Sequence, residues 1–158
     1  MPSRLFIDLN TIDLDRVIYD VEAIEQVNLQ RYEMRHLDGI VHLDPEAGYV
    51  VGFKDVRDDE FWVRGHIPGR PLFPGVLMIE AAAQLASFAV KKKLSSENRF
   101  VGFGGVEQVK FRTQVTPGQR LYLIGKFLEV RPRRFKLAAQ GVVENKLAFE
   151  ATVIGMPM

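Results

Sequence analysis

The sequence predicts an α+β domain in which a curved antiparallel sheet wraps around one long apolar helix. Residues 75–92 favour a helix and are apolar on nearly every side, which is typical of a helix buried in the centre of a protein. After it, residues 100–155 divide into long extended segments joined by tight turns. Long antiparallel strands need a partner layer to bury one face, and the helix supplies that layer.

Upstream of the helix, the spacing of apolar residues predicts a further helix and a hairpin. An amphipathic helix that starts at Asp13 or Asp15 and runs to about Val27 is indicated by Leu14, Val17, Ile18, Val21 and Ile24. Residues 37–43 and 49–54 predict two strands joined by the turn 44–48, and residues 61–63 a short extended piece. Residues 65–75 are rich in Gly and Pro, which excludes regular structure there.

Downstream of the helix, four extended segments are expected: 100–115, 121–130, 135–143 and 147–155. The turns between them fall at residues 116–119, at the arginine cluster 131–134 and at Glu144-Asn145. Without an internal repeat or a linker, we expect one domain over residues 1–158, with a helical extension at 1–28 and the core at 29–158.

Composition excludes several classes of protein. The net charge of +1 gives no basic field for nucleic acid, and the absence of cysteine excludes disulfides and thiolate chemistry. The most apolar stretch, 75–90, is interrupted by Glu80, Gln84 and Ser87 and is too short to span a bilayer. No export signal is recognisable, so we expect a cytoplasmic protein that binds neither nucleic acid nor membrane.

Two local basic clusters allow two interpretations. They are Lys91-Lys92-Lys93 at the end of the predicted helix and Arg131, Arg133 and Arg134 at a predicted hairpin tip. They are either solvated ends of secondary structure or a docking surface for an acidic carrier protein.

The most informative segment is residues 65–84, which joins a rigid loop to the predicted helix. It reads Gly-His-Ile-Pro-Gly-Arg-Pro-Leu-Phe-Pro-Gly-Val-Leu-Met-Ile-Glu-Ala-Ala-Ala-Gln. His66 lies in a loop whose φ angles are restricted by prolines. The first helical N–H groups, those of Gly75 and Val76, lack intrahelical acceptors and are suited to an oxygen that gains negative charge. Glu80 and Gln84 follow on one face, where burial favours a neutral carboxylic acid.

These groups match the removal of water from a β-hydroxyacyl thioester. That reaction needs a base for the α proton, donors for the enolate oxygen and an acid for the departing hydroxyl. His66, the helix N-terminus and Glu80 supply these roles. Taken singly, a histidine in a turn is more often structural, and a lone Glu on an apolar helix more often lies at a surface or an interface.

The segment resembles the signature of the β-hydroxyacyl-[acyl-carrier-protein] dehydratases, roughly Gly-His-Phe-Pro-Gly-x-Pro-x-x-Pro-Gly-Val-Leu-x-x-Glu-Ala-x-Ala-Gln, with Ile67 in place of Phe. The similarity extends over residues 31–155 and is strongest in the centre. It implies the hotdog fold and an active site at a homodimer interface, in an assembly that is either a dimer or a trimer of dimers. It assigns the base to His66, the acid to Glu80 of the opposing subunit, the oxyanion donor to Gly75, and a residue that holds water or the acid to Gln84.

The resemblance also implies a thioester substrate on acyl carrier protein or coenzyme A, whose acyl arm runs along the apolar helix. Candidate tunnel residues, each of which also suits a plain core, are Phe73, Leu77, Phe103 and Phe111. The chain departs from the family upstream, where a Pro-Phe-Leu-Leu-Val-Asp-Arg run is replaced by Glu33-Met34-Arg35-His36-Leu37-Asp38-Gly39. Arg64 and the extension 1–28 are further departures, and together they suggest a specialised paralogue.

Two other functions remain open on the sequence. A hotdog thioesterase would use Glu80 to direct water at the carbonyl, but it leaves the His66 loop without a role. A non-catalytic acyl-binding protein has no need of an acid and a base together, so the presence of both His66 and Glu80 argues against it. His36 and His42 form no recognised ligand set with His66, and no phosphate-binding loop is present, so we expect no metal, nucleotide or other cofactor.

Overall fold

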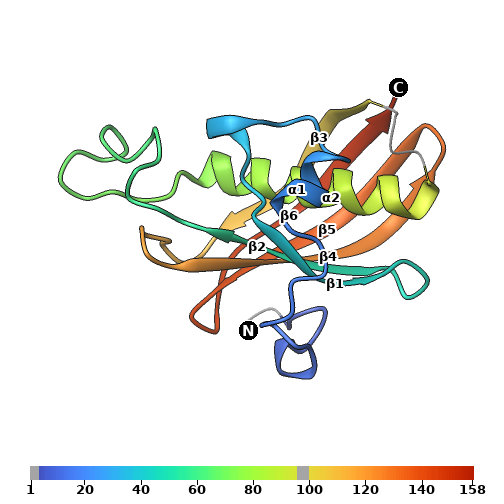
Figure 1. Cartoon of the computed structure of the whole chain (residues 1–158), viewed down its shortest axis with the longest axis horizontal. Helices are drawn as coiled ribbons and strands as arrows, with labels where there is room; N and C mark the ends of the chain where they lie inside the picture. Colours follow the sequence, from blue (N-terminus) through green and yellow to red (C-terminus); the bar gives the residue numbers. More distant parts are fainter. Residues whose placement is uncertain (1–3, 96–99) are drawn as a thin grey trace.

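A computed structural model describes residues 4–95 and 100–158, and its centre is one long helix lying on a curved sheet. The helix α2 (Gly75–Leu94) crosses one face of six antiparallel strands, and the sheet curves around it (Figure 1). This is the hotdog arrangement, so the predicted fold class is confirmed. Among the described residues, no helix is both long and apolar enough to cross a membrane.

The strands are paired in the order β1-β2-β4-β5-β6-β3. Their bounds are β1 Gly39–Asp44, β2 Tyr49–Asp55, β3 Val101–Phe111, β4 Arg120–Arg131, β5 Arg134–Val143 and β6 Lys146–Pro157. Three tight hairpins join neighbours in sequence, whereas β3, which follows α2, pairs with β6 at the far edge. The predicted strands therefore match the observed ones to within a few residues, except that β3 ends four residues early.

The main core lies between α2 and the concave face of the sheet. Leu85, Phe88 and Ala89 on the helix are fully buried against side chains such as Leu123 and Leu137. A second apolar cluster covers the opposite face, where Val41, Val51, Phe53, Ile124 and Val142 are buried under the N-terminal segment 5–14. The sheet is thus apolar on both faces.

The predicted N-terminal helix is wrong in its extent. The structure has only a 3-10 turn η1 (Leu9–Thr11) and a short helix α1 (Val21–Glu25), which Asp20 caps by accepting from the Ala23 N–H at 2.9 Å. Between them the chain is irregular, with a turn at residues 14–15, and Tyr19 bridges to Ile40 at the edge of the sheet. A second 3-10 turn, η2 (Tyr32–Met34), precedes β1.

Two smaller expectations are also wrong. Residues 61–63 form turns rather than an extended piece, and they lead into the loop that carries His66. Lys91 is buried instead of solvated, since its Nζ donates to the Val27 carbonyl at 2.9 Å and burial lowers the pKa of the amine. Lys92 packs over the rings of Tyr19 and Phe88.

Candidate active site

The loop that carries His66 is held at both ends by buried aromatic residues. Trp62 and Phe73 lie in the core with their ring centroids 5.4 Å apart. The Trp62 carbonyl accepts from the His66 N–H at 2.8 Å, and the Phe73 N–H donates to the Val115 carbonyl at 2.8 Å. The segment between these anchors has no helix or strand, as the Gly/Pro content predicted, and most of it is exposed. His66 therefore stands in a fixed loop that is open to solvent.

Hydrogen bonding selects the tautomer of His66. Its Nδ1 lies 2.8 Å from the carbonyl oxygen of Leu72, and the His66 carbonyl in turn accepts from the Leu72 N–H. A carbonyl can only accept, so Nδ1 carries the hydrogen of a neutral imidazole. The lone pair is then on Nε2, and Nε2 is the nitrogen that can take a proton from a substrate.

The helix that follows begins with two free amides. Pro74 precedes α2 without a side-chain cap, and its carbonyl accepts from the Leu77 and Met78 N–H groups. No hydrogen bond of the described residues uses the N–H of Gly75 or Val76. These amides point out of the positive end of a 20-residue helix, which suits an oxyanion.

Gly75 is required sterically as well as chemically. A Cβ at this position would lie 2.8 Å from the ring of Phe111, far inside van der Waals contact. The Phe111 side chain is half exposed and stacks on Phe149 at a centroid distance of 6.5 Å. The absence of a side chain therefore lets strand β3 approach the start of α2 closely.

Glu80 and Gln84 lie on one face of α2 and contact each other. The Gln84 Nε2 donates to Glu80 Oε1 at 2.9 Å, one helical turn away. Gln84 is almost fully buried, whereas Glu80 is only half buried and lines a pocket of about 190 Å³. The expectation of a carboxyl inside the apolar centre is thus too strong, since Glu80 faces a cavity.

The pocket beside Glu80 is mostly apolar. It lies between α2 and the edge of the sheet formed by β3 and β6, with Ala83 and Ser87 continuing the helix face. Of the predicted tunnel residues, Phe103 lines this pocket. Phe73 belongs to the core, Leu77 packs on it, and Phe111 covers Gly75 instead.

Within one chain the structure brings Glu80 to Gln84 but not to His66. The Glu80 pocket has no lining residue from the His66 loop, and no contact joins the two side chains among the described residues. Among the described residues, the contacts of Glu80 are thus with α2 and its pocket rather than with the loop that carries His66.

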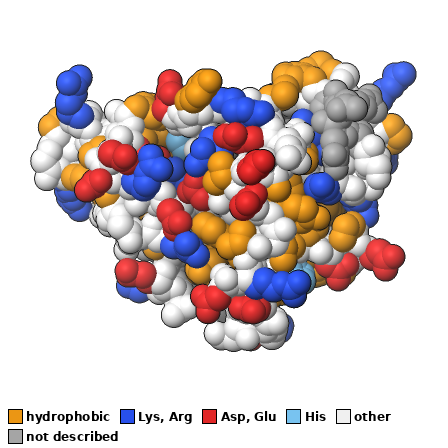
Figure 2. Space-filling view, in the orientation of Figure 1, with side chains coloured by type: hydrophobic (Ala, Val, Ile, Leu, Met, Phe, Trp, Pro, Cys, Tyr) orange, Lys and Arg blue, Asp and Glu red, His pale blue; other side chains and the backbone are white. Residues whose placement is uncertain are grey.

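The arginines predicted to dock a carrier lie at the tip of the β4–β5 hairpin. Arg131, Arg133 and Arg134 are exposed, although Arg131 pairs with Glu129 at 2.7 Å. Figure 2 shows positive and negative side chains interspersed over the face in view, in keeping with the net charge of +1.

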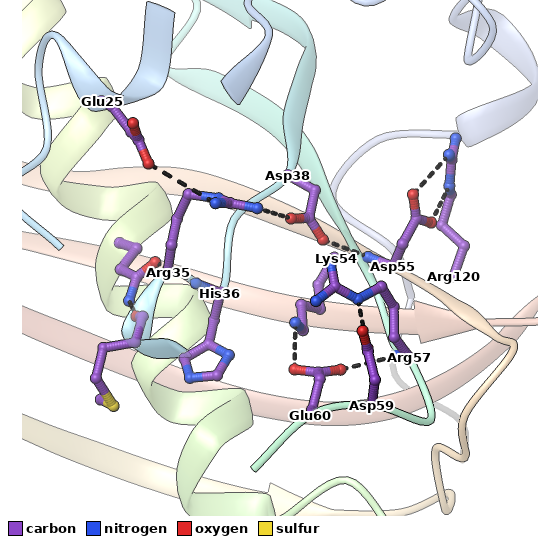
Figure 3. Close-up of polar contacts among 12 residues, drawn as sticks. Glu25, Arg35, His36, Asp38, Lys54, Asp55, Arg57, Asp59, Glu60 and Arg120 are labelled. Carbon is purple, nitrogen blue, oxygen red and sulfur yellow. Dashed lines mark hydrogen bonds and ion pairs between the residues drawn. The ribbon is translucent and has the colours of Figure 1, made fainter. Parts of the chain in front are cut away.

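A buried polar cluster near the His66 loop was missed by the sequence analysis. His36 is fully buried, and burial together with the charge of Lys54 lowers its pKa to about 4. Lys54 is itself buried and pairs with Glu60 at 2.6 Å (Figure 3). Arg35 bridges Glu25 and Asp38 on the same side. The available signal was the replacement of two leucines of the family pattern by Arg35-His36.

The structure is thus a hotdog fold in which a histidine-bearing loop leads into the uncapped N-terminus of the central helix, one face of which carries Glu80 and Gln84. A family model described as a FabA-like domain matches residues 28–152, and the chain belongs to that family. Two similar proteins are each named 3-hydroxyacyl-[acyl-carrier-protein] dehydratase FabZ. The one from Desulforamulus reducens is 36% identical over 135 residues, 85% of this chain and 94% of that protein. The one from Helicobacter hepaticus is 34% identical over 94% of this chain and 95% of that protein. The family resemblance of the motif is thus confirmed.

Solved structures support the fold. A chain of the dehydratase heterocomplex ApeI:P from Xenorhabdus doucetiae matches with a TM-score of 0.73 and 13% identity, over 85% of this chain and 90% of that one. Cj0977, a virulence protein from Campylobacter jejuni, matches with a TM-score of 0.66 and 16% identity, over 89% and 94%.

Proposed function

We propose that the chain is a dehydratase that converts 3-hydroxyacyl thioesters on acyl carrier protein into trans-2-enoyl thioesters. The observation that carries the proposal is a helix N-terminus with free amides, flanked by His66, whose Nδ1 is bonded to the Leu72 carbonyl, and followed by Glu80 in a pocket. The names of the FabZ relatives supply the substrate class.

Each group has one step in this reaction. His66 Nε2 removes the α proton, and the Gly75 N–H, with that of Val76, stabilises the enolate oxygen. The electron pair of the broken C–H bond forms the double bond as the β-hydroxyl leaves. Glu80 donates the proton that turns the hydroxyl into water, and the proton held by His66 returns to Glu80 through solvent. No cofactor takes part.

The reaction centre is completed by a second copy, which contributes Glu80 opposite His66. Large apolar side chains remain exposed on β3 and the first turn of α2: Val76 (71%), Phe103 (48%), Val106 (37%) and Phe111 (53%). Strand β3 is also an edge of the sheet with unpaired backbone groups. A homodimer through this edge, alone or within a trimer of dimers, covers both.

The acyl arm enters the pocket beside Glu80, and Phe103, which lines that pocket, contacts the arm. The exposed arginines of the β4–β5 hairpin are the docking surface for the acidic carrier, and coenzyme A thioesters are weaker substrates because they lack the carrier protein. Such a reaction belongs to fatty-acid synthesis or a related specialised pathway, in the cytoplasm.

The test follows enoyl product and free thiol together, with 3-hydroxybutyryl-acyl carrier protein as substrate. The wild type should form enoyl thioester, and His66→Ala and Glu80→Gln should each lose it. Subunits of these two inactive variants, dissociated and mixed, should regain about a quarter of wild-type activity, since half of the dimers are mixed and hold one intact centre of two. Free thiol without enoyl product would instead identify a thioesterase, and no regain on mixing would place both groups in one subunit.

A further inference from the structure

The pocket beside Glu80 contains two polar side chains that the dehydration step does not use. Of the described residues that line this cavity of about 190 Å³, only Glu80, Gln30 and Ser87 have polar side chains, and the others are Gly, Ala, Val, Ile or Phe. A pocket that receives only a saturated acyl chain has no use for further hydrogen-bonding groups in its wall. Gln30 and Ser87 therefore call for a partner of their own.

Ser87 continues the face of α2 that carries Glu80 and Ala83. The spacing i, i+3, i+7 places these three side chains in one row, and Ser87 lies about 10 Å further along the helix than Glu80. Ser87 is 9% exposed, and no hydrogen bond among residues 4–95 and 100–158 uses its hydroxyl. A hydroxyl that can both donate and accept is thus free in the pocket, two helical turns from the acid.

Gln30 reaches the same part of the pocket from the segment upstream of β1. This segment is bonded to α2 before and after Gln30, by Lys91 Nζ at 2.9 Å and by Gln84 Nε2 at 2.7 Å, each of which donates to a backbone carbonyl. Gln30 therefore lies along the stretch of α2 that contains Ser87. Its Oε1 is buried and has no hydrogen-bond partner among the described residues. A buried amide oxygen without a donor is unfavourable, so this position favours a ligand that supplies one.

We propose that the substrate carries a second hydroxyl on its acyl chain, and that Ser87 and Gln30 bind this hydroxyl. The inference rests on the proposed dehydratase function and names the acyl chain that the pocket prefers. A hydroxyl both donates and accepts, so it suits the Gln30 oxygen and the Ser87 hydroxyl together. A ketone at the same place could only accept, and an alkyl chain would leave both groups without a partner.

The geometry of the pocket gives the position of this hydroxyl on the chain. Glu80 protonates the departing β-hydroxyl, so the β-carbon lies beside Glu80. An extended chain advances about 1.3 Å per carbon, and the distance of about 10 Å to Ser87 corresponds to about eight carbons. The cavity of about 190 Å³ has room for about six groups of the size of a water molecule. We therefore expect the second hydroxyl about six to eight carbons beyond the β-carbon.

The experiment compares three substrates on acyl carrier protein that differ only in the second hydroxyl: 3-hydroxydecanoyl, 3,6-dihydroxydecanoyl and 3,9-dihydroxydecanoyl thioesters. The wild type should use the 3,9-dihydroxy substrate with a kcat/KM about tenfold above the other two. Ser87→Ala and Gln30→Leu should each lose most of this preference. The loss should be mainly in KM, because the bond to the remote hydroxyl is equal in the ground state and the transition state.

Thr152→Val is the matched control for removing a buried hydroxyl. Thr152 is also 9% exposed, but it lines a different pocket, beside Phe6 on the outer face of the sheet. This variant should keep the tenfold preference. An equal loss of preference in Thr152→Val would refute a direct contact of Ser87 with the substrate.

A binding measurement separates this inference from the reaction. Calorimetry with the unreactive pantetheine thioesters of decanoic acid and 9-hydroxydecanoic acid measures the same preference without turnover. Equal or tighter binding and faster turnover of the plain chain, an equal gain from the 6-hydroxyl, or a preference that survives both Ser87→Ala and Gln30→Leu overturns the inference. Tighter binding of the hydroxylated chain without enoyl product from any substrate would instead refute the proposed dehydratase and leave the hydroxyl site standing.

Discussion

Replacing His36 by leucine should remove part of the acid sensitivity of the fold. The His36 ring is fully buried, and its centroid lies 6.0 Å from that of Phe73 and 6.5 Å from that of Phe61. Neither ring nitrogen has a hydrogen-bond partner among residues 4–95 and 100–158. Burial, and then the charge of Lys54, lowers its pKa from 6.5 to about 4. The folded protein therefore keeps the ring neutral, while the unfolded chain protonates it.

The sign and size of the effect follow from this difference. Below pH 6.5 the unfolded state binds the extra proton, so stability is present above that pH and is lost progressively as the pH falls towards 4. Between pH 7 and pH 5 the linkage amounts to about 2 kcal/mol of unfolding free energy. Because leucine does not titrate, His36→Leu should abolish this part of the pH dependence of the unfolding free energy.

Urea unfolding at pH 7 and at pH 5 measures the change in unfolding free energy directly. The wild type should lose about 2 kcal/mol more than His36→Leu over this interval. His42→Leu, on the neighbouring strand β1, is the matched control for losing a histidine. Equal loss in the wild type and His36→Leu, or the same flattening in His42→Leu, would refute burial of His36 as the cause.

Three further predictions concern other parts of the molecule. Lys54→Met should lower the unfolding free energy by about 3 kcal/mol, because it leaves Glu60 buried without the lysine. The double variant Lys54→Met/Glu60→Leu should recover most of this loss, as measured by urea unfolding. Gly75→Ala should lower kcat about tenfold or more by pushing the Phe111 ring aside, and Phe111→Ala should relieve it in the same enoyl assay if the clash is the cause. Deleting residues 1–14 should produce larger species in gel filtration, because the outer apolar face of the sheet is uncovered. If the truncated protein eluted at the same volume as the full chain, this last expectation would be wrong.

The central part of the molecule was predictable because its signals are local. The loop, the helix start and the Glu80–Gln84 pair fall within 20 consecutive residues. Both the residue types and their relative positions could therefore be predicted from one short segment. The strands of the C-terminal half are likewise set off by short turns. Local spacing could not provide the contacts between distant segments, such as the bond from the His36 N–H to Gln84 Oε1.

The N-terminal helix failed because its apolar residues serve two different layers. Leu14 packs on the outer face of the sheet, whereas Ile24 and Val27 belong to the core around α2. A helical stripe assumes that all its members face one surface. Here the chain crosses the edge of the sheet between them, where Tyr19 bridges to Ile40. The spacing was therefore coincidental.

His36 and Lys91 show the limit of judging burial from residue type. Both are polar and both are buried, since the neutral ring of His36 packs among aromatic rings and the amine of Lys91 reaches a backbone carbonyl. Such burial depends on partners distant in sequence.

The N-terminal segment also limits how copies of this chain can assemble. Residues 5–14 lie over the outer face of the sheet, with Gln140 bonded to the backbone of Arg4 and Phe6 at one end. Two sheets therefore cannot stack back to back through that face while the segment is in place. Contacts between copies of this chain would then have to use the edges, ends and loops of the sheet, because its outer face is already covered within the chain.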